Sequence, residues 1–118
     1  MIPFELSELS HTWFIDLDGT IIQHNSHLTD QDELLPGVKE FWNNVPQNDY
    51  IVITTGRPKE YESSTLAFLN LHGLRYDCAL FGLPWGERIV VNDVKPGGLK
   101  TAIAWNVDRD QGFKNDSN

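Results

Sequence analysis

The sequence predicts an α/β fold built on an open, mainly parallel sheet with helices on both faces. Short apolar runs alternate with stretches of helical periodicity, which is typical of βαβ units. The runs lack polar alternation, which indicates strands buried on both faces. A chain of 118 residues can bury one core and is too short for two domains, so we expect a single domain over residues 1–113.

Four apolar runs are predicted to be strands, and a weaker fifth follows them: residues 12–15, 50–54, 78–81, 88–91 and 101–105. Pro36 can begin a helix between the first two. Its apolar stripe follows the i, i+3, i+4, i+7 pattern, as Val38, Phe41, Trp42 and Val45. This stripe is predicted to pack on the sheet.

A second helix is predicted after the second run. Pro58 can open it, and Gly73 can end it in a left-handed conformation. Strands and helices then alternate, and in such sheets functional sites lie at the carboxyl ends of the strands. The residues that follow each strand are therefore the candidates for chemistry.

Composition excludes several classes of function. The net charge of −8 offers no general attraction to nucleic acid or to anionic membranes. No apolar run approaches the ~20 residues of a membrane span, and the N-terminus lacks the pattern of a secretory signal. One cysteine, Cys78, fits a reduced compartment, so we expect a cytoplasmic protein. The polar segment 114–118 is expected to be a frayed tail.

Two acidic residues follow the first run, in the segment Asp16-Leu17-Asp18-Gly19-Thr20. Side chains alternate along an extended chain, so Asp16 and Asp18 point the same way while Leu17 turns toward the core. Paired carboxylates repel each other unless a cation shares them, and Mg²⁺ takes carboxylate and phosphate oxygens. One acid can then attack phosphorus while the other handles protons. The alternative is a strand that ends in an ordinary Asp-Gly turn.

The second run is followed by Thr55, Gly56 and Arg57. These residues supply a hydroxyl, a glycine turn and a cation. Hydroxyl and amide groups at a helix start donate to phosphate oxygens, and a guanidinium matches them with two parallel donors. We expect these residues to bind a substrate phosphate. A structural turn with a solvated arginine is the alternative.

Asn92 and Asp93 follow the fourth run. An aspartate there would face the first acidic pair and complete an oxygen-rich metal site, whereas the alternative is an aspartate that caps a turn. The three polar segments follow three predicted strands. We therefore expect them to meet at one edge of the sheet.

The three segments, in this order, resemble motifs I, II and IV of the haloacid dehalogenase (HAD) superfamily of phosphotransferases over residues 12–94. The resemblance implies a Rossmann-like core in which Asp16 forms an aspartyl-phosphate and binds Mg²⁺. It implies that Asp18 serves as acid and base and lends its carbonyl to the metal. Thr55 would hold the phosphoryl group, and Asp93, with Asn92, would anchor the metal.

One feature departs from the family. Its motif III lysine has no counterpart between Gly73 and Val94, and Leu83 stands where some small relatives carry it. Lys95 is the preferred substitute, with Lys59 and Arg88 as alternatives. A solvated surface charge is the simpler interpretation of each.

The resemblance implies a capless enzyme, because the segments between the motifs are too short to hold a cap domain. The expected function is a Mg²⁺-dependent phosphomonoester hydrolase acting on a sugar phosphate or similar small metabolite. A homo-oligomer could supply a cap in trans. A weakened metal- and phosphate-binding module is one alternative, and a phosphotransferase is another.

Overall fold

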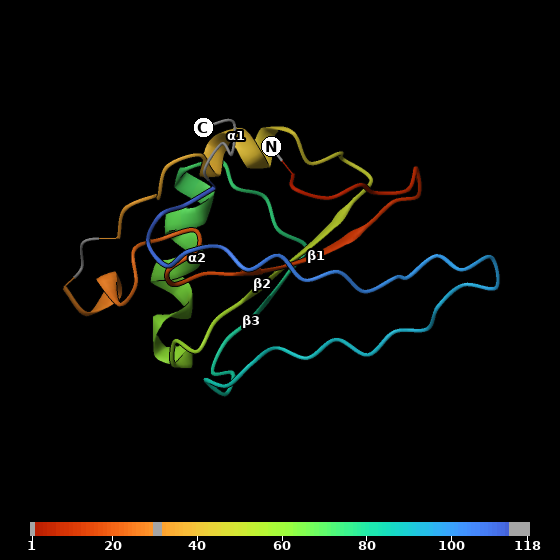
Figure 1. The fold of residues 1–118 in the computed structure, drawn as a ribbon. Helices are drawn as coiled ribbons and strands as arrows, with labels where there is room; N and C mark the ends of the chain where they lie inside the picture. The colour runs from red at the N-terminus through yellow and green to blue at the C-terminus, as the bar shows by residue number, and fades with distance from the viewer. Residues whose placement is uncertain (1, 30–31, 114–118) are drawn as a thin grey trace.

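The computed structural model describes residues 2–29 and 32–113, and the predicted tail at 114–118 lies outside this part of the chain. The structure is an α/β arrangement around a small open sheet (Figure 1). Its elements in chain order are β1 (Thr12–Asp16), the 3₁₀ helix η1 (Ser26–Thr29), α1 (Val38–Asn43), β2 (Tyr50–Thr54), the 3₁₀ helix η2 (Lys59–Tyr61), α2 (Glu62–Leu71) and β3 (Cys78–Leu80).

The sheet has three parallel strands in the order β1-β2-β3. Asp16 lies level with Thr54, and Thr54 with Leu80, so the carboxyl ends of the three strands lie together at one end of the sheet. The first three predicted strands are therefore confirmed in place. As expected, the acidic segment that begins at Asp16 and the segment Thr55-Gly56-Arg57 both start from this end of the sheet, after β1 and β2.

The two helices begin and end close to the predicted positions. α1 follows Pro36 and Gly37, buries Val38 and Trp42, and is fixed by a hydrogen bond from Trp42 Nε1 to the Arg75 carbonyl (2.8 Å). α2 buries Thr65 and Leu69. It ends at the expected glycine: Gly73 has φ +69°, a conformation that favours glycine because it lacks Cβ.

The core lies on one face of the sheet, which corrects the expectation of helices on both faces. Alternate strand residues pack with residues of both helices on this face: Trp13, Ile15, Ile51, Ile53 and Ala79 with Val38, Trp42 and Leu69. On the opposite face Phe14, Tyr50 and Leu80 are exposed by 60%, 48% and 42%, whereas Val52 and Thr54 of the central strand are buried. A second layer would need a helix after β3, and residues 81–113 contain none.

The predicted fourth and fifth strands do not form. Residues 84–105 instead make an extended two-legged excursion, called here the arm, which projects from the body (Figure 1). A turn joins its legs, with hydrogen bonds from the Lys95 amide to the Leu99 carbonyl (2.9 Å) and from the Gly98 amide to the Lys95 carbonyl (2.8 Å). Ile89 and Val91, expected to be buried, are 84% and 90% exposed. A strand needs a neighbouring strand to satisfy its backbone. The two legs pair only at the Val94–Lys100 bridge, and no strand of the described residues lies beside residues 88–91.

The chain then returns to the body along residues 106–113. The Asp110 amide donates to the Gly19 carbonyl (2.9 Å), and the Phe113 amide donates to the Pro36 carbonyl (2.9 Å). The Phe113 ring stacks on Phe41 at a centroid distance of 4.4 Å. This packing ties the C-terminal segment to the turn that follows β1.

None of the helices in the described residues is long and apolar enough to cross a membrane.

Asp49 joins the starts of β1 and β2, so its loss should destabilise the fold. The carboxylate accepts hydrogen bonds from the His11 amide (3.0 Å) and from Trp13 Nε1 (2.9 Å) and is 5% exposed. Asp49→Ala should lower the free energy of unfolding by about 1–3 kcal/mol, because it leaves buried donors without an acceptor. Urea unfolding measures this, with Asp108→Ala, at an exposed site, as the control.

The same variant should show a defined pH dependence. Burial opposes ionisation of Asp49, but the hydrogen bonds from Trp13 and His11 outweigh burial and hold its pKa below the usual 3.8. The stabilisation is therefore present above pH 3.8 and is lost as the pH falls through the lower folded value. The difference between wild type and Asp49→Ala should shrink below pH 3.8. A difference that grows there would contradict this role.

Candidate functional site

The acidic turn after β1 has the predicted alternation. Leu17 is fully buried, and its amide donates to the Thr54 carbonyl (3.0 Å), which extends the pairing of β1 with β2. Gly19 follows with φ +87°, which lets the chain turn back sharply. Asp16 and Asp18 flank Leu17 at the carboxyl end of the sheet.

Asp16 is the open carboxylate of the site. Its side chain is 45% exposed, and Oδ2 accepts a hydrogen bond from the Thr20 hydroxyl (3.2 Å). Arg88 Nη2 lies 3.8 Å from Oδ1. Partial burial raises the pKa of Asp16 above 3.8, and the charge of Asp18 adds to this, while Thr20 and Arg88 oppose it. The Asp16 carboxylate is therefore accessible from solvent and has a cation beside it.

Asp18 belongs instead to a buried ion-pair network centred on Arg57. Arg57 Nε and Nη2 donate to Asp18 at 3.0 and 2.9 Å, and Nη1 and Nη2 donate to Asp32 at 3.1 and 3.0 Å. Nη1 also donates to the Thr65 hydroxyl at 2.9 Å. All five guanidinium N–H groups thus have partners, and Arg57 is 3% exposed.

The contacts of Arg57 differ from the phosphate-binding role that the sequence predicted. Its guanidinium donates to two carboxylates of this chain, so in this structure it has no free donors for a phosphate. Burial opposes ionisation of Asp32, but hydrogen bonds from Arg57 and Ser26 outweigh burial and lower the pKa of Asp32. Burial likewise opposes the charge on Arg57, yet Asp32 and Asp18 raise its pKa. The network holds the loop after β1 against the start of α2.

Thr55 and Gly56 take different positions in the turn after β2. The Thr55 hydroxyl donates to Asp18 Oδ2 (3.0 Å) and accepts from the Arg57 amide (3.0 Å), so it is fully engaged and buried. A Cβ on Gly56 would lie 2.7 Å from Trp85 Nε1, because the indole covers the turn. The Gly56 amide has no hydrogen-bond partner among the described residues. Of the three predicted phosphate ligands, Gly56 retains a free donor.

The structure does not bring Asn92 and Asp93 to the acidic turn of the same chain. Both lie exposed on the arm, where the Asn92 amide and the Asp93 carbonyl are bonded to the Thr101 hydroxyl. Within residues 2–29 and 32–113, no three His, Cys, Asp or Glu side chains are grouped as metal ligands would be. The expected gathering of Asp16, Asp18 and Asp93 is therefore wrong for one chain in this arrangement.

The cation nearest the open carboxylate is Arg88, which the sequence ranked below Lys95. Arg88 Nη1 donates to the Pro84 and Gly86 carbonyls (3.1 and 3.0 Å), and these bonds orient the guanidinium. Lys95 lies exposed in the turn of the arm, and Lys59 lies exposed in η2. The hydrogen bonds to the loop, which the linear sequence does not reveal, explain why Arg88 faces Asp16.

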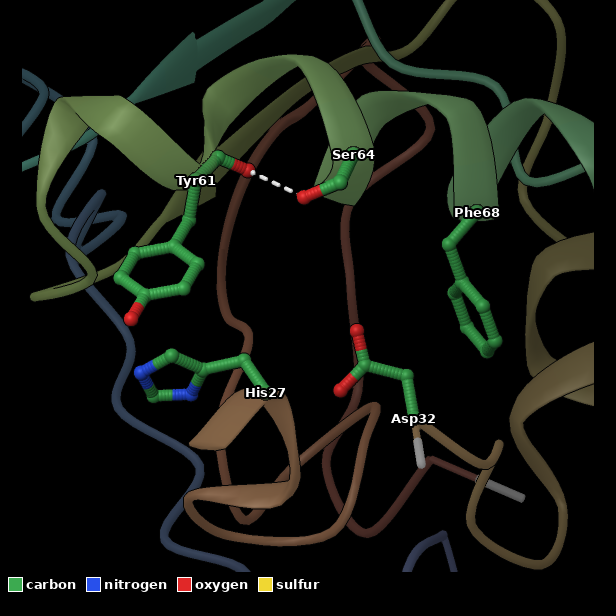
Figure 2. Close-up of a pocket in the computed structure, with 5 residues that line it drawn as sticks. All are labelled: His27, Asp32, Tyr61, Ser64 and Phe68. Atoms are coloured by element: carbon green, nitrogen blue, oxygen red, sulfur yellow. Dashed lines mark hydrogen bonds between the residues drawn. The ribbon is translucent and has the colours of Figure 1, made fainter. Parts of the chain in front are cut away.

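A pocket of about 220 Å³ lies beside this network, between the loop that carries η1 and the first turns of α2. Figure 2 shows His27 and Asp32 on the loop side and Tyr61, Ser64 and Phe68 on the helix side. His27 packs edge-on against Tyr61, and its Nδ1 lies 3.9 Å from Asp18 Oδ1. Burial lowers the pKa of His27, and Arg57 lowers it further. The pocket thus adjoins the acidic turn through Asp18.

Sequence reasoning missed Asp32, which lines the pocket and holds Arg57. No spacing rule singles it out, because it lies in a loop among other acidic residues. A buried arginine implies a carboxylate partner, but the burial of Arg57 is decided by the tertiary structure, so the sequence held no signal for Asp32.

Comparisons with protein-family models, with curated proteins and with solved structures found no match to this chain.

Replacing Arg57 should be costly even by lysine. Arg57→Lys keeps the charge but has three donors on a single nitrogen in place of a planar five-donor fork, so it cannot reproduce the paired hydrogen bonds to Asp18 and Asp32. The free energy of unfolding should fall by about 1–3 kcal/mol, because buried carboxylate oxygens lose hydrogen-bond donors. Urea unfolding measures this, with Arg109→Lys at an exposed arginine as the matched control. Equal unfolding midpoints for the two variants would show that the network is not structural.

Proposed function

We propose that this protein is a Mg²⁺-dependent phosphomonoester hydrolase that works through an aspartyl-phosphate on Asp16, with a sugar phosphate or similar small metabolite as substrate. The observation that carries the proposal is the environment of Asp16: a half-exposed carboxylate at the carboxyl end of β1, beside a guanidinium. The resemblance of the three polar segments to HAD motifs supplies the reaction class.

The proposed reaction has two steps. An Asp16 oxygen forms a bond to phosphorus while the bond from phosphorus to the ester oxygen breaks, and the alcohol leaves with a proton. Water then attacks the aspartyl-phosphate and releases inorganic phosphate and the free carboxylate. The exposure of Asp16 supports the first step, because a phosphate ester can reach it without displacing a hydrogen bond from Arg57.

In the proposed reaction Asp18 exchanges protons only after it gives up one of its hydrogen-bond partners. Its oxygens accept hydrogen bonds from Arg57 and Thr55. Protonating the leaving alcohol would require Asp18 to exchange one of these bonds for a proton. His27 Nδ1, at 3.9 Å, is the one neighbouring group in the described residues that could deliver it.

Arg88 supports the proposal as the positive charge beside the nucleophile. A phosphate ester brings two negative charges toward Asp16, and a guanidinium within about 4 Å offsets part of the repulsion. In this role Arg88 takes the place that we expected for Lys95.

The residues described in one chain do not by themselves fit Mg²⁺. Asp16 and Asp18 supply two acidic groups, but the third, Asp93, is exposed on the arm. Mg²⁺ would supply charge neutralisation at the transferring phosphoryl group.

A metal- and phosphate-binding module remains the second candidate. It is favoured by the saturated hydrogen bonds of Arg57 and Asp18, which suit a fixed structure better than proton transfer. A phosphotransferase would use the same Asp16 chemistry, with an acceptor alcohol in place of water.

Asp16→Asn should abolish hydrolysis, because an amide oxygen cannot form the acyl-phosphate. The assay is phosphate release from 4-nitrophenyl phosphate and a panel of sugar phosphates, with Mg²⁺ and with chelator. Wild type and the control Glu40→Gln, on an exposed face of α1, should turn over only with Mg²⁺. A phosphorylated acceptor in place of free phosphate would indicate a transferase. No turnover by folded wild type across the panel would favour the binding module.

Arg88 should matter more than the two lysines. Arg88→Met should lower kcat/KM by about 10-fold or more, because Asp16 loses its neighbouring cation. Lys59→Met and Lys95→Met, assayed in parallel, should cost less, and Lys39→Met on α1 should be neutral. A larger loss for Lys95→Met would restore Lys95 as the catalytic cation.

A further inference from the structure

The chain has an unpaired sheet edge at β1 and an exposed apolar segment on the arm, and the two are complementary. The outer edge of β1 pairs with no strand in the described residues, so its backbone groups are open to a further strand. The arm carries an apolar, β-branched segment, Ile89-Val90-Val91, with side chains 84%, 53% and 90% exposed. Exposed sheet edges and exposed apolar strands are both liabilities unless something covers them.

The total surface indicates how much is left uncovered. The accessible area is 8244 Å². A folded monomer of 13.5 kDa is expected to expose about 6,500 Å². The excess of about 1,700 Å² exceeds the ~800 Å² that each partner buries in a standard interface and falls in the range of obligate dimers. The radius of gyration, 14.8 Å, likewise exceeds the ~13.5 Å of a compact domain of this length.

The arm contributes much of the exposed apolar surface. It holds half of the large hydrophobic residues that are exposed in the described chain: Trp85, Ile89, Val90, Val91, Val94, Leu99 and Ile103. Its charge also differs from that of the body. Residues 84–105 carry three cations and two acids, a net +1, whereas the other residues sum to −9. An acidic body of the same protein is therefore an electrostatically suitable partner for the arm.

In its observed direction, the first leg of the arm cannot complete the site as a parallel strand on its own β1. Arg88 is held beside Asp16, at the carboxyl end of β1. Figure 1 shows that the first leg of the arm leaves from this end and runs in the sense opposite to β1. Folded back on its own β1, the segment would be antiparallel, and Asp93 would arrive about 16 Å from Asp16, at the amino end of the strand.

A second copy removes this conflict. A twofold axis perpendicular to the arm reverses the direction of the partner's β1, so that the arm of one copy runs parallel to the β1 of the other. The added strand then matches the parallel sheet and ends with Asp93 at the partner's acidic turn. Each copy gives an arm and receives one, as in a closed isologous interface.

We propose that this protein is an arm-exchanged homodimer in which residues 88–93 of one copy add as a parallel strand to the free edge of β1 in the other. The exchange brings Asn92 and Asp93 to Asp16 in trans, and this second part rests on the proposed function. It accounts for the exposed arm, the open edge and the separation of the acidic residues within one chain.

The first test is the oligomeric state, which does not depend on activity. Light scattering of the full chain should give twice 13.5 kDa at micromolar concentration. Val91→Asp should shift the protein to monomer, because it places a charge in the new strand next to an acidic partner. Leu71→Asp, at an equally exposed apolar residue of α2, should remain dimeric. A wild-type monomer would overturn the proposal.

Cross-linking distinguishes exchange from other dimers. In a Cys78→Ser background, one chain carries Phe14→Cys on β1 and a differently tagged chain carries Val91→Cys on the arm. A short bismaleimide should join the two chains when they are co-expressed. A cross-link that forms only within a chain carrying both substitutions would show that the arm closes on its own body and would refute the proposal.

Mixing two inactive variants tests the shared site. Asp16→Asn and Asp93→Asn should each be inactive alone. Co-expressed, they form heterodimers in which Asp16 of one copy meets Asp93 of the other in one intact site, so activity should return to about a quarter of wild type. No recovery from mixtures that light scattering and cross-linking show to be exchanged would refute assembly of the site in trans. If wild type itself were inactive, the proposed function would fail while the first two tests still decided the exchange.

Discussion

A single buried guanidinium holds the carboxyl end of this sheet together. Arg57 stands at the turn after β2 and binds Asp18 from the turn after β1 and Asp32 from the loop beyond it. Removing an arginine from water is costly, and only paired carboxylates offset the cost. The network therefore couples the acidic turn, the neighbouring pocket and the start of α2.

The two aspartates of the acidic turn differ because only Asp18 is bound by Arg57. Asp18 is tied to Arg57 and Thr55, whereas Asp16 retains exposure and has Arg88 beside it. Two equivalent carboxylates in sequence thus become one positioned acceptor and one accessible group. The pocket lined by His27 and Tyr61 lies on the Asp18 side of the acidic turn.

The other strong constraint is the incomplete covering of the sheet. Both helices pack on one face, and the outer edge of β1 stays free of partners in the described chain. The apolar surface that would normally cover such a sheet is displayed on the arm. The free edge of β1 can pair with the exposed arm segment of a second copy, and the proposed exchange consists of this pairing.

The sequence by itself determined the local features: three parallel strands with shared carboxyl ends, two helices with their glycine boundary, and the acidic turn after β1. These depend on periodicity, turn residues and burial, which short segments encode. Tertiary structure alone decided that Arg57 meets carboxylates of its own chain, that Arg88 approaches Asp16, and that residues 88–91 project with the arm. Such outcomes depend on partners distant in the chain, and an apolar run becomes a buried strand only where a neighbouring strand is present to satisfy its backbone.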